Sequence, residues 1–204
     1  MAALPRLVRI ALVAYPAAAA LAATIAWWRE APLIEGHALI GDGAPMHLAS
    51  LGMGLITALA GVLSTRALVR RTEWARSLRT ELRAVLPALD ARSAWVLALA
   101  SGTAEELLFR GALQPWLGLV LASLVFGAAH FVPRRRLWTW AAWATVVGLV
   151  LGAILELTGS IAGAVLAHVL INGINLGDLT RHDPELDAQP PPPPRLAVRR
   201  TRSR

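Results

Sequence analysis

Residues 93–114 read SAWVLALASGTAEELLFRGALQ, and this stretch decides the fold class of the chain. It is long enough to cross a bilayer as one helix, because a membrane-spanning helix needs about 20 predominantly apolar residues. Near its middle lie three charged residues, Glu105, Glu106 and Arg110. Ionisable side chains are costly in lipid and are usually functional there. The stretch therefore predicts a membrane-spanning helix that carries part of a functional site.

Apolar runs on both sides of this stretch predict an all-α, polytopic membrane protein with about six transmembrane helices. The chain has 204 residues, of which 56% are hydrophobic, and a mean hydropathy of +0.54. This composition is too apolar for an ordinary soluble domain. We expect a break at Pro115 after the third span. The other five spans are expected at residues 7–28, 47–69, 116–132, 137–157 and 161–176.

The first apolar run, residues 7–28, also has an interpretation as a signal peptide. Arginines flank its start, and the stretch from Ala17 to Ala23 is rich in the small residues that a cleavage site requires. We expect an uncleaved helix instead, because the run is long and the rest of the chain is also apolar enough to be embedded in a membrane.

Polar segments divide the chain into four regions. Residues 1–69 hold two helices, residues 70–92 form an Arg-rich connector, residues 93–176 form the transmembrane core, and residues 177–204 form a tail. The connector is typical of an amphipathic cytoplasmic helix on an anionic membrane surface, and a solvated connector explains its pattern equally well. Because the tail contains five consecutive prolines, Pro190 to Pro194, we expect it to be disordered.

The distribution of arginine predicts the orientation of the chain. All twenty basic residues are arginine, and the formal net charge is +7. Six spans with a cytoplasmic N-terminus place the arginine clusters on the cytoplasmic side and leave Arg29 on the other. We therefore expect a multi-pass protein of the cell inner (cytoplasmic) membrane with both termini in the cytoplasm. No groove-reading motif accompanies the charge, so we expect contact with lipid and no nucleic-acid partner.

The absence of cysteine limits the chemistry that the chain can perform. Disulfides, thiolate metal ligands and a cysteine nucleophile are all excluded. Glu106 and Arg110 lie four residues apart, so they share a helical face and are expected to pair. Glu105 points about 100° away around the helix and is free to face another partner.

Polar residues also occur in the fourth and sixth predicted spans. His130 lies near the end of the fourth span, one helical turn after Phe126. His168 and Asn172 lie four residues apart in the sixth span and therefore share one face. Three helices thus present polar groups that can converge at one depth.

These residue types suit the hydrolysis of a peptide bond in a cavity shielded from lipid. A glutamate beside a histidine can take a proton from water, and an asparagine can donate a hydrogen bond to an oxyanion. The same residue types also serve proton or ion pathways, and each one alone can be structural. Zinc bound by Glu105, His130 and His168 is a further alternative, although the His-Glu-x-x-His motif is absent.

Three motifs in this order resemble the signature of the CAAX-protease and bacteriocin-processing family (CPBP, also called Abi): Glu105-Glu106-x-x-x-Arg110, Phe126-x-x-x-His130 and His168-x-x-x-Asn172. The resemblance covers about residues 93–176. It implies a glutamic-type intramembrane endopeptidase with Glu105 as the general base and His130 holding the water. It assigns the oxyanion to His168 and Asn172.

The resemblance also implies supporting roles for Glu106, Arg110 and Phe126, and no cofactor. Its implied substrate is a membrane-associated protein or peptide. Exclusive use of arginine and abundant alanine are typical of a bacterial protein, for which a prenylated CaaX substrate is not expected. Two alternatives stay open: a non-catalytic membrane immunity or partner protein of the same fold, and a small proton-coupled transporter, which the absence of internal repeats disfavours.

Overall fold

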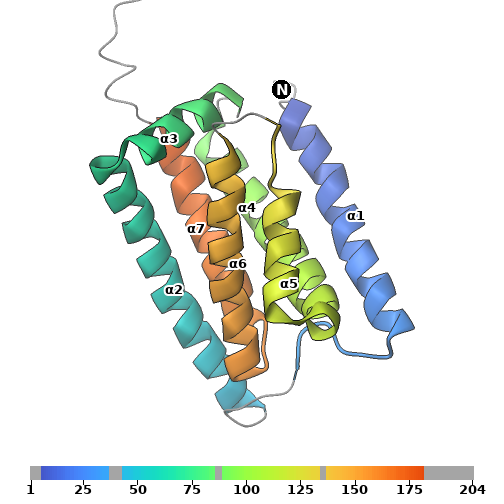
Figure 1. Ribbon diagram of the computed structural model, residues 1–204. Helices are drawn as coiled ribbons and strands as arrows, with labels where there is room; N and C mark the ends of the chain where they lie inside the picture. The colour runs from blue at the N-terminus through green and yellow to red at the C-terminus, as the bar shows by residue number, and fades with distance from the viewer. Residues whose placement is uncertain (1–5, 37–42, 86–88, 134–136, 182–204) are drawn as a thin grey trace, which may run out of the picture.

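The protein is a bundle of long helices in this computed structural model, which describes residues 6–36, 43–85, 89–133 and 137–181 (Figure 1). No strand occurs among these residues, which confirms the predicted all-α class. The elements in chain order are α1 (Arg6–Trp28), α2 (Ala44–Arg71), α3 (Glu73–Val85), α4 (Ala91–Glu106), the π-helix η1 (Leu107–Leu113), α5 (Gln114–Ala129), α6 (Trp138–Thr158) and α7 (Ala162–Arg181).

Five helical runs within the described residues are long and apolar enough to cross a membrane. One of them, Ala91–Ala129, comprises α4, η1 and α5 and is interrupted at Gly118, where φ is 76° and ψ is 165°. After this interruption α5 rises beside α6, so the run forms two arms and the bundle is close to the six helices predicted (Figure 1). The break was predicted at Pro115, but proline fits the first turn of a helix, whereas a positive φ favours glycine.

Helix α7 extends further than the sequence predicted. The last span was expected to end at Leu176, yet the helix continues to Arg181. Its final turns gain tertiary partners, since Asp178 forms an ion pair with Arg66 of α2 at 2.8 Å and its carbonyl accepts a hydrogen bond from Arg79 of α3. Part of the predicted tail is therefore helical. Residues 190–194 lie outside the described part of the chain.

The described chain begins and ends at the same end of the bundle. Helix α3 lies across this end, near the start of α1 and the end of α7 (Figure 1). Its residues Ala75 and Leu78 are buried. The apolar face of α3 is therefore turned toward the protein rather than wholly toward lipid or water.

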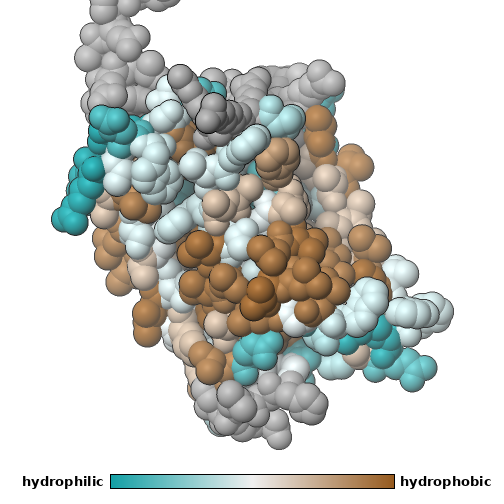
Figure 2. Space-filling view, viewed as in Figure 1, coloured by the Kyte–Doolittle hydropathy of each residue, from teal (hydrophilic) through white to brown (hydrophobic). Residues whose placement is uncertain are grey.

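The outer surface of the bundle is apolar, as expected for a multi-pass membrane protein. Hydrophobic residues cover the middle of the face in Figure 2, and hydrophilic residues lie nearer its ends. Val13 of α1 and Ile56 of α2 are 72% and 71% exposed, so large side chains face outward from the helices. Such a surface suits contact with lipid tails rather than water.

Small residues bring α2 and α7 close together. A Cβ atom added to Gly163 would collide with the backbone oxygen of Ser50, and one added to Gly54 would meet the backbone of Gly163. Small residues commonly let helix backbones approach in membranes. The Ser50 hydroxyl also accepts a hydrogen bond from the Gly163 N–H at 2.9 Å. This contact fixes the start of α7 and therefore the position of His168 further along it.

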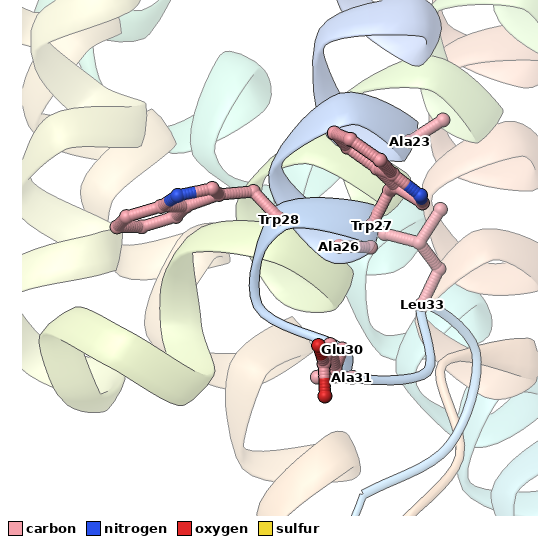
Figure 3. Close-up of a pocket in the computed structure, with 7 residues that line it drawn as sticks. All are labelled: Ala23, Ala26, Trp27, Trp28, Glu30, Ala31 and Leu33. Carbon is pink, nitrogen blue, oxygen red and sulfur yellow. The ribbon is translucent and has the colours of Figure 1, made fainter.

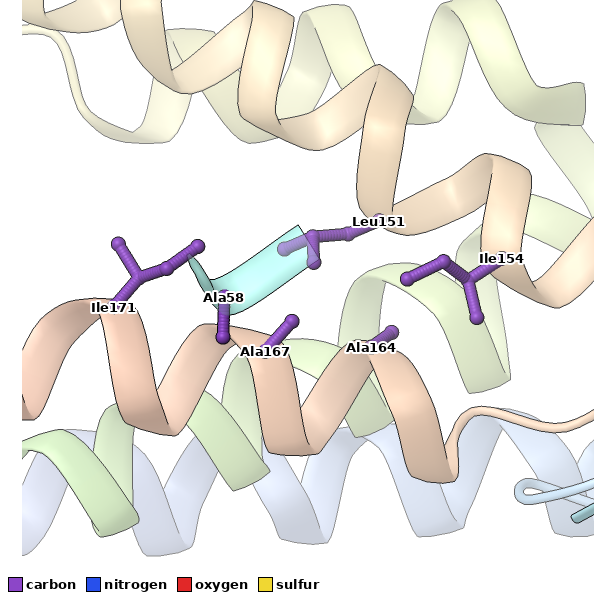
Figure 4. Close-up of a cluster of buried hydrophobic side chains, with 6 residues drawn as sticks. All are labelled: Ala58, Leu151, Ile154, Ala164, Ala167 and Ile171. Carbon is purple, nitrogen blue, oxygen red and sulfur yellow. The ribbon is translucent and has the colours of Figure 1, made fainter. Parts of the chain in front are cut away.

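The largest apolar core lies between α2, α6 and α7 (Figure 4). Leu151 and Ile154 of α6 project toward the alanines of α7 and toward α2. These side chains are almost completely buried, at 0% and 1% exposure. The cluster comprises Ala58, Leu151, Ile154, Ala164, Ala167 and Ile171.

Asp90 caps the N-terminus of α4, and its charge should stabilise the helix in a pH-dependent way. Its carboxylate accepts a hydrogen bond from the Ser93 N–H at 2.7 Å, and the bonds from Ser93 lower the pKa of Asp90 below its usual value of 3.8. A lowered pKa in the folded state means that the ionised cap stabilises the fold above about pH 3.8. This stabilisation is lost as the pH falls through the folded pKa.

We expect Asp90→Ala to unfold at a lower temperature than the wild type at neutral pH, with the difference shrinking as the pH falls below 3.8. Thermal unfolding in detergent across pH measures this effect. Asp90→Ser is the matched control, because serine also caps helices but does not titrate. Equal unfolding temperatures of the wild type and Asp90→Ala at neutral pH would contradict the assignment.

Candidate functional site

The first charged motif lies where α4 changes into a π-helix. Glu105 and Glu106 end α4, and Arg110 lies within η1, where the Gln114 N–H bonds to the carbonyl of Phe109, five residues earlier. A π-helical turn is rare and often occurs at functional sites. This π-helix was not predicted.

Glu106 and Arg110 form the predicted ion pair. The Arg110 Nε lies 3.1 Å from Glu106 Oε2, and the Arg110 Nη1 donates to Glu106 Oε1 at 3.2 Å. Both side chains are almost completely buried. The Arg110 Nη2 donates to the Gly148 carbonyl at 2.9 Å, and the guanidinium lies over the Phe126 ring at 4.5 Å. The buried cation is therefore balanced by a carboxylate, a carbonyl and a ring face.

Glu106 also orients His168. The Nδ1 atom of His168 lies 2.7 Å from Glu106 Oε1, and His168 is only 4% exposed. An ionised carboxylate can only accept, so the Nδ1 atom carries the hydrogen of this bond. The Nε2 atom of His168 is thereby directed away from Glu106 and lies 3.9 Å from Glu105 Oε2.

His130 is oriented in the same way by a backbone group. Its Nδ1 lies 2.8 Å from the Phe126 carbonyl, which can only accept, so this nitrogen also carries a hydrogen. Its Nε2 then lies 3.7 Å from Glu105 Oε2. The ring is held between Phe126 and Trp140, with centroid separations of 4.6 and 5.4 Å. Trp140 was not predicted as part of the site.

The structure thus brings Glu105, His130 and His168 together at one point. Both histidine distances to Glu105 Oε2 exceed that of a direct hydrogen bond. Among the described residues, this oxygen has no hydrogen-bond partner and is buried. A carboxylate oxygen and the lone pairs of two imidazole nitrogens are all acceptors, so the point they share suits a small molecule with two hydrogens to donate, such as water.

Asn172 joins this group indirectly. It lies one turn after His168, and its Nδ2 donates to the hydroxyl of Ser101 at 3.1 Å. Ser101 lies on α4, one turn before Glu105, and is 4% exposed. Ser101 was not predicted as part of the site.

Glu105, His130, Ser101 and Asn172 line a cavity of about 900 Å³. Most of its wall comes from the part of each helix that lies nearest α3. Apolar side chains of α2, α3 and α7 dominate the lining, and Glu105, His130 and Asn172 lie at its inner end. The residues that form its apolar wall include Leu68, Val69, Trp74, Leu78, Leu82, Leu97, Leu176 and Leu179.

A second cavity, of about 620 Å³, lies around the end of α1 and the loop after it (Figure 3). Trp27 and Trp28 extend on either side of the helix end, and Glu30 is the one ionisable residue of its lining. None of the predicted site residues lines this cavity. It therefore does not belong to the candidate site.

A polar cluster near the start of α7 has the order carboxylate, imidazole and hydroxyl. His47 Nδ1 lies 2.9 Å from Ser160 Oγ, and His47 Nε2 lies 3.4 Å from Glu35 Oε1. Ser160 is only 1% exposed, and its hydroxyl accepts a hydrogen bond from the Ala162 N–H. A buried hydroxyl in this position caps the start of α7 and is inaccessible to a substrate.

The three residues of the zinc alternative lie near one another, with Glu105 Oε2 3.7 Å from His130 Nε2 and 3.9 Å from His168 Nε2. Within the described ranges, no three histidine, aspartate or glutamate side chains are arranged to hold a metal ion.

Part of the chain is similar to known proteins. Residues 87–174 match the family described as type II CAAX prenyl endopeptidase Rce1-like, and this segment contains all the predicted site residues. A stretch of 78 residues is 40% identical to the uncharacterized protein YpbD of Bacillus subtilis (strain 168). That alignment covers 38% of this chain and 41% of the relative. No solved structure matches the chain.

Proposed function

We propose that the protein is an intramembrane endopeptidase that hydrolyses a peptide bond with a water activated by glutamate and histidine, because residues 87–174 match the family described as type II CAAX prenyl endopeptidase Rce1-like. The observation that carries this proposal is the convergence of Glu105 Oε2 and the two Nε2 atoms of His130 and His168. The cavity beside them gives a substrate access to the same point.

In the proposed reaction, a water molecule donates one hydrogen toward Glu105 and the other toward an imidazole Nε2. Glu105 takes a proton as the water oxygen attacks the carbonyl carbon of the scissile bond, and the carbonyl oxygen becomes an oxyanion. The same carboxyl then gives its proton to the nitrogen as the C–N bond breaks. The products are a carboxylate and an amine.

Asn172 is the proposed donor to the oxyanion. Its amide has two N–H bonds and gives one to Ser101, so the other is available to the substrate. In this proposal His168 holds the water together with His130, because its Nδ1–H is used by Glu106. The role of Glu106, Arg110 and Phe126 is to fix His168 and the end of α4.

The cavity indicates the kind of substrate. Its wall is mostly apolar, and it lies toward the end of the bundle that α3 covers. We propose a membrane-associated protein or peptide whose apolar segment enters from that end. We further propose that this end faces the cytoplasm of a bacterial cell, in the inner membrane, because the arginine clusters support that orientation.

The experiment that tests the function compares the termini of membrane proteins in cells that contain the wild type or the Glu105→Gln variant. We expect peptide termini that occur only with the wild type, and the proteins that carry them are the candidate substrates. Identical sets of termini, together with a cellular phenotype that both variants support, would favour a non-catalytic partner protein of the same fold.

Metal dependence has a separate test. We expect the purified protein to keep its cleavage activity after treatment with EDTA or 1,10-phenanthroline, because side chains and not a metal ion activate the water in the proposed reaction. Metal analysis of the same sample gives the zinc content. Loss of activity with the chelator, and its recovery after addition of zinc, would contradict the metal-free mechanism.

A further inference from the structure

Asn175 is a polar residue of the cavity wall that belongs to none of the three motifs. It lies three residues after Asn172 on α7, so the two residues are about 4.5 Å apart along the helix axis. Both of them line the same cavity. The helix continues to Asp178, whose carbonyl accepts a hydrogen bond from Arg79 of α3. Asn175 therefore lies between Asn172 and the end of the cavity that α3 covers.

The amide of Asn175 uses only part of its hydrogen-bonding capacity. Its Nδ2 donates to the hydroxyl of Thr65 on α2 at 3.5 Å, which is a long and therefore weak hydrogen bond. This is the one hydrogen bond that the side chain makes within the described residues. A side-chain amide has two N–H bonds and a carbonyl oxygen. One N–H and the oxygen are thus available to a molecule in the cavity.

Other polar side chains of this part of the cavity wall already have partners. The Thr65 hydroxyl donates to the Gly61 carbonyl at 2.9 Å, besides accepting from Asn175. The guanidinium of Arg66 pairs with the carboxylate of Asp178 at 2.8 Å. These groups are therefore less able than the Asn175 amide to bond to a ligand.

The main chain of a peptide needs polar partners when it enters such a cavity. The wall is mostly apolar, and an unpaired peptide N–H or C=O is costly away from water. A side-chain amide offers one donor and one acceptor and can pair with both groups of a peptide main chain. Because an extended chain advances by about 3.3 Å per residue, a spacing of about 4.5 Å places Asn175 within roughly two residues of the scissile bond.

We propose that Asn175 binds the main chain of the substrate, on the side of the scissile bond that extends toward α3. This inference rests on the proposed function, in which Asn172 meets the carbonyl oxygen of the scissile bond. It assigns Asn175 to substrate binding and not to the chemical step. Recognition of this kind depends on the peptide main chain and tolerates different side chains.

The activity test uses Asn175→Ala, which removes the amide and cannot obstruct the cavity. The probe is a peptide that spans a cleavage site found by the comparison of termini. We expect KM to rise roughly 10-fold, as for the loss of one or two hydrogen bonds, with kcat within about twofold of the wild type.

Thr65→Val is the matched control, since it removes the same hydrogen bond between α2 and α7 but keeps the Asn175 amide. We expect its KM to equal that of the wild type. Polar residues also join helices within membranes without binding a ligand. If Asn175 does only this, Asn175→Ala and Thr65→Val will lower the unfolding temperature alike and leave KM unchanged, which would overturn the inference.

A modified peptide tests the contact itself without proteolysis. In each modified peptide an ester replaces one of the four peptide groups nearest the scissile bond, so that one N–H is lost. Fluorescence anisotropy gives the affinity of each labelled peptide for Glu105→Gln, with either asparagine or alanine at position 175. We expect one ester to weaken binding roughly 10-fold with asparagine and to have little effect with alanine. Equal effects in both proteins at every position would contradict a bond to Asn175.

The two proposals fail in distinguishable ways. If the wild type cleaves the peptide, Glu105→Gln does not, and Asn175→Ala matches the wild type in KM, the binding role is wrong and the proposed function stands. If the wild type cleaves nothing that Glu105→Gln leaves intact, both proposals are overturned.

Discussion

Replacing Glu105 with glutamine should abolish peptide-bond hydrolysis and leave the fold intact. Glutamine has nearly the same shape but cannot take a proton from water, and the loss of a general base typically costs 10²- to 10⁴-fold in rate. The fold should survive, because the two histidines lie 3.7 and 3.9 Å from Glu105 Oε2 and make no direct hydrogen bond to it. Cleavage of an identified substrate in proteoliposomes, with thermal unfolding of the same samples, measures both effects.

The matched control for this variant is Glu156→Gln. Glu156 also lies in a membrane-spanning helix, α6, but belongs to none of the three motifs. It accepts a hydrogen bond from Gln114 at 3.0 Å. It does not line the cavity. We expect this control to cleave at the wild-type rate. A Glu105→Gln variant that cleaves as fast as its control would remove the basis of the proposed mechanism.

Replacing Glu106 with alanine should destabilise the protein strongly. Arg110 would lose its carboxylate partner while it stays buried, and breaking a buried ion pair in this way costs about 3–5 kcal/mol. His168 would also lose the group that orients it, since its Nδ1 lies 2.7 Å from Glu106 Oε1. We expect a lower free energy of unfolding in mixed micelles and little remaining activity.

A double variant distinguishes the effect of the ion pair on protein stability from the effect of Glu106 on the orientation of His168. In Glu106→Leu/Arg110→Met both charges are removed together, and replacing a buried pair by apolar residues of similar size is often close to neutral. We expect this double variant to recover much of the stability but not the activity, because His168 still lacks its partner. A single Glu106→Ala variant as stable as the wild type would show that the pair does not balance Arg110.

Much of the fold could be predicted from the lengths of the apolar runs. The first and fifth spans, expected at residues 7–28 and 137–157, lie at Arg6–Trp28 and Trp138–Thr158. These spans were predictable because lipid requires long apolar helices with few charges. The reversal at Gly118 was not predictable in the same way, because a positive φ depends on how the two arms pack.

The candidate site was predicted in part. Helical spacing gave the pair of Glu106 and Arg110, since residues four apart share a face. It could not give the hydrogen bond from Asn172 to Ser101, because this bond depends on the packing of α7 against α4.

The π-helix η1 makes this site sensitive to the length of its chain and not only to its composition. Because the Gln114 N–H bonds to the carbonyl five residues earlier, η1 has one residue more than a regular turn needs. Losing one residue between Glu106 and Arg110 would restore ordinary helix geometry and would place Arg110 three residues, instead of four, after its partner. Its guanidinium would then leave the position in which it meets Glu106, the Gly148 carbonyl and the Phe126 ring. A single-residue deletion in a membrane helix, which conserves every side chain named above, would thus dismantle the site.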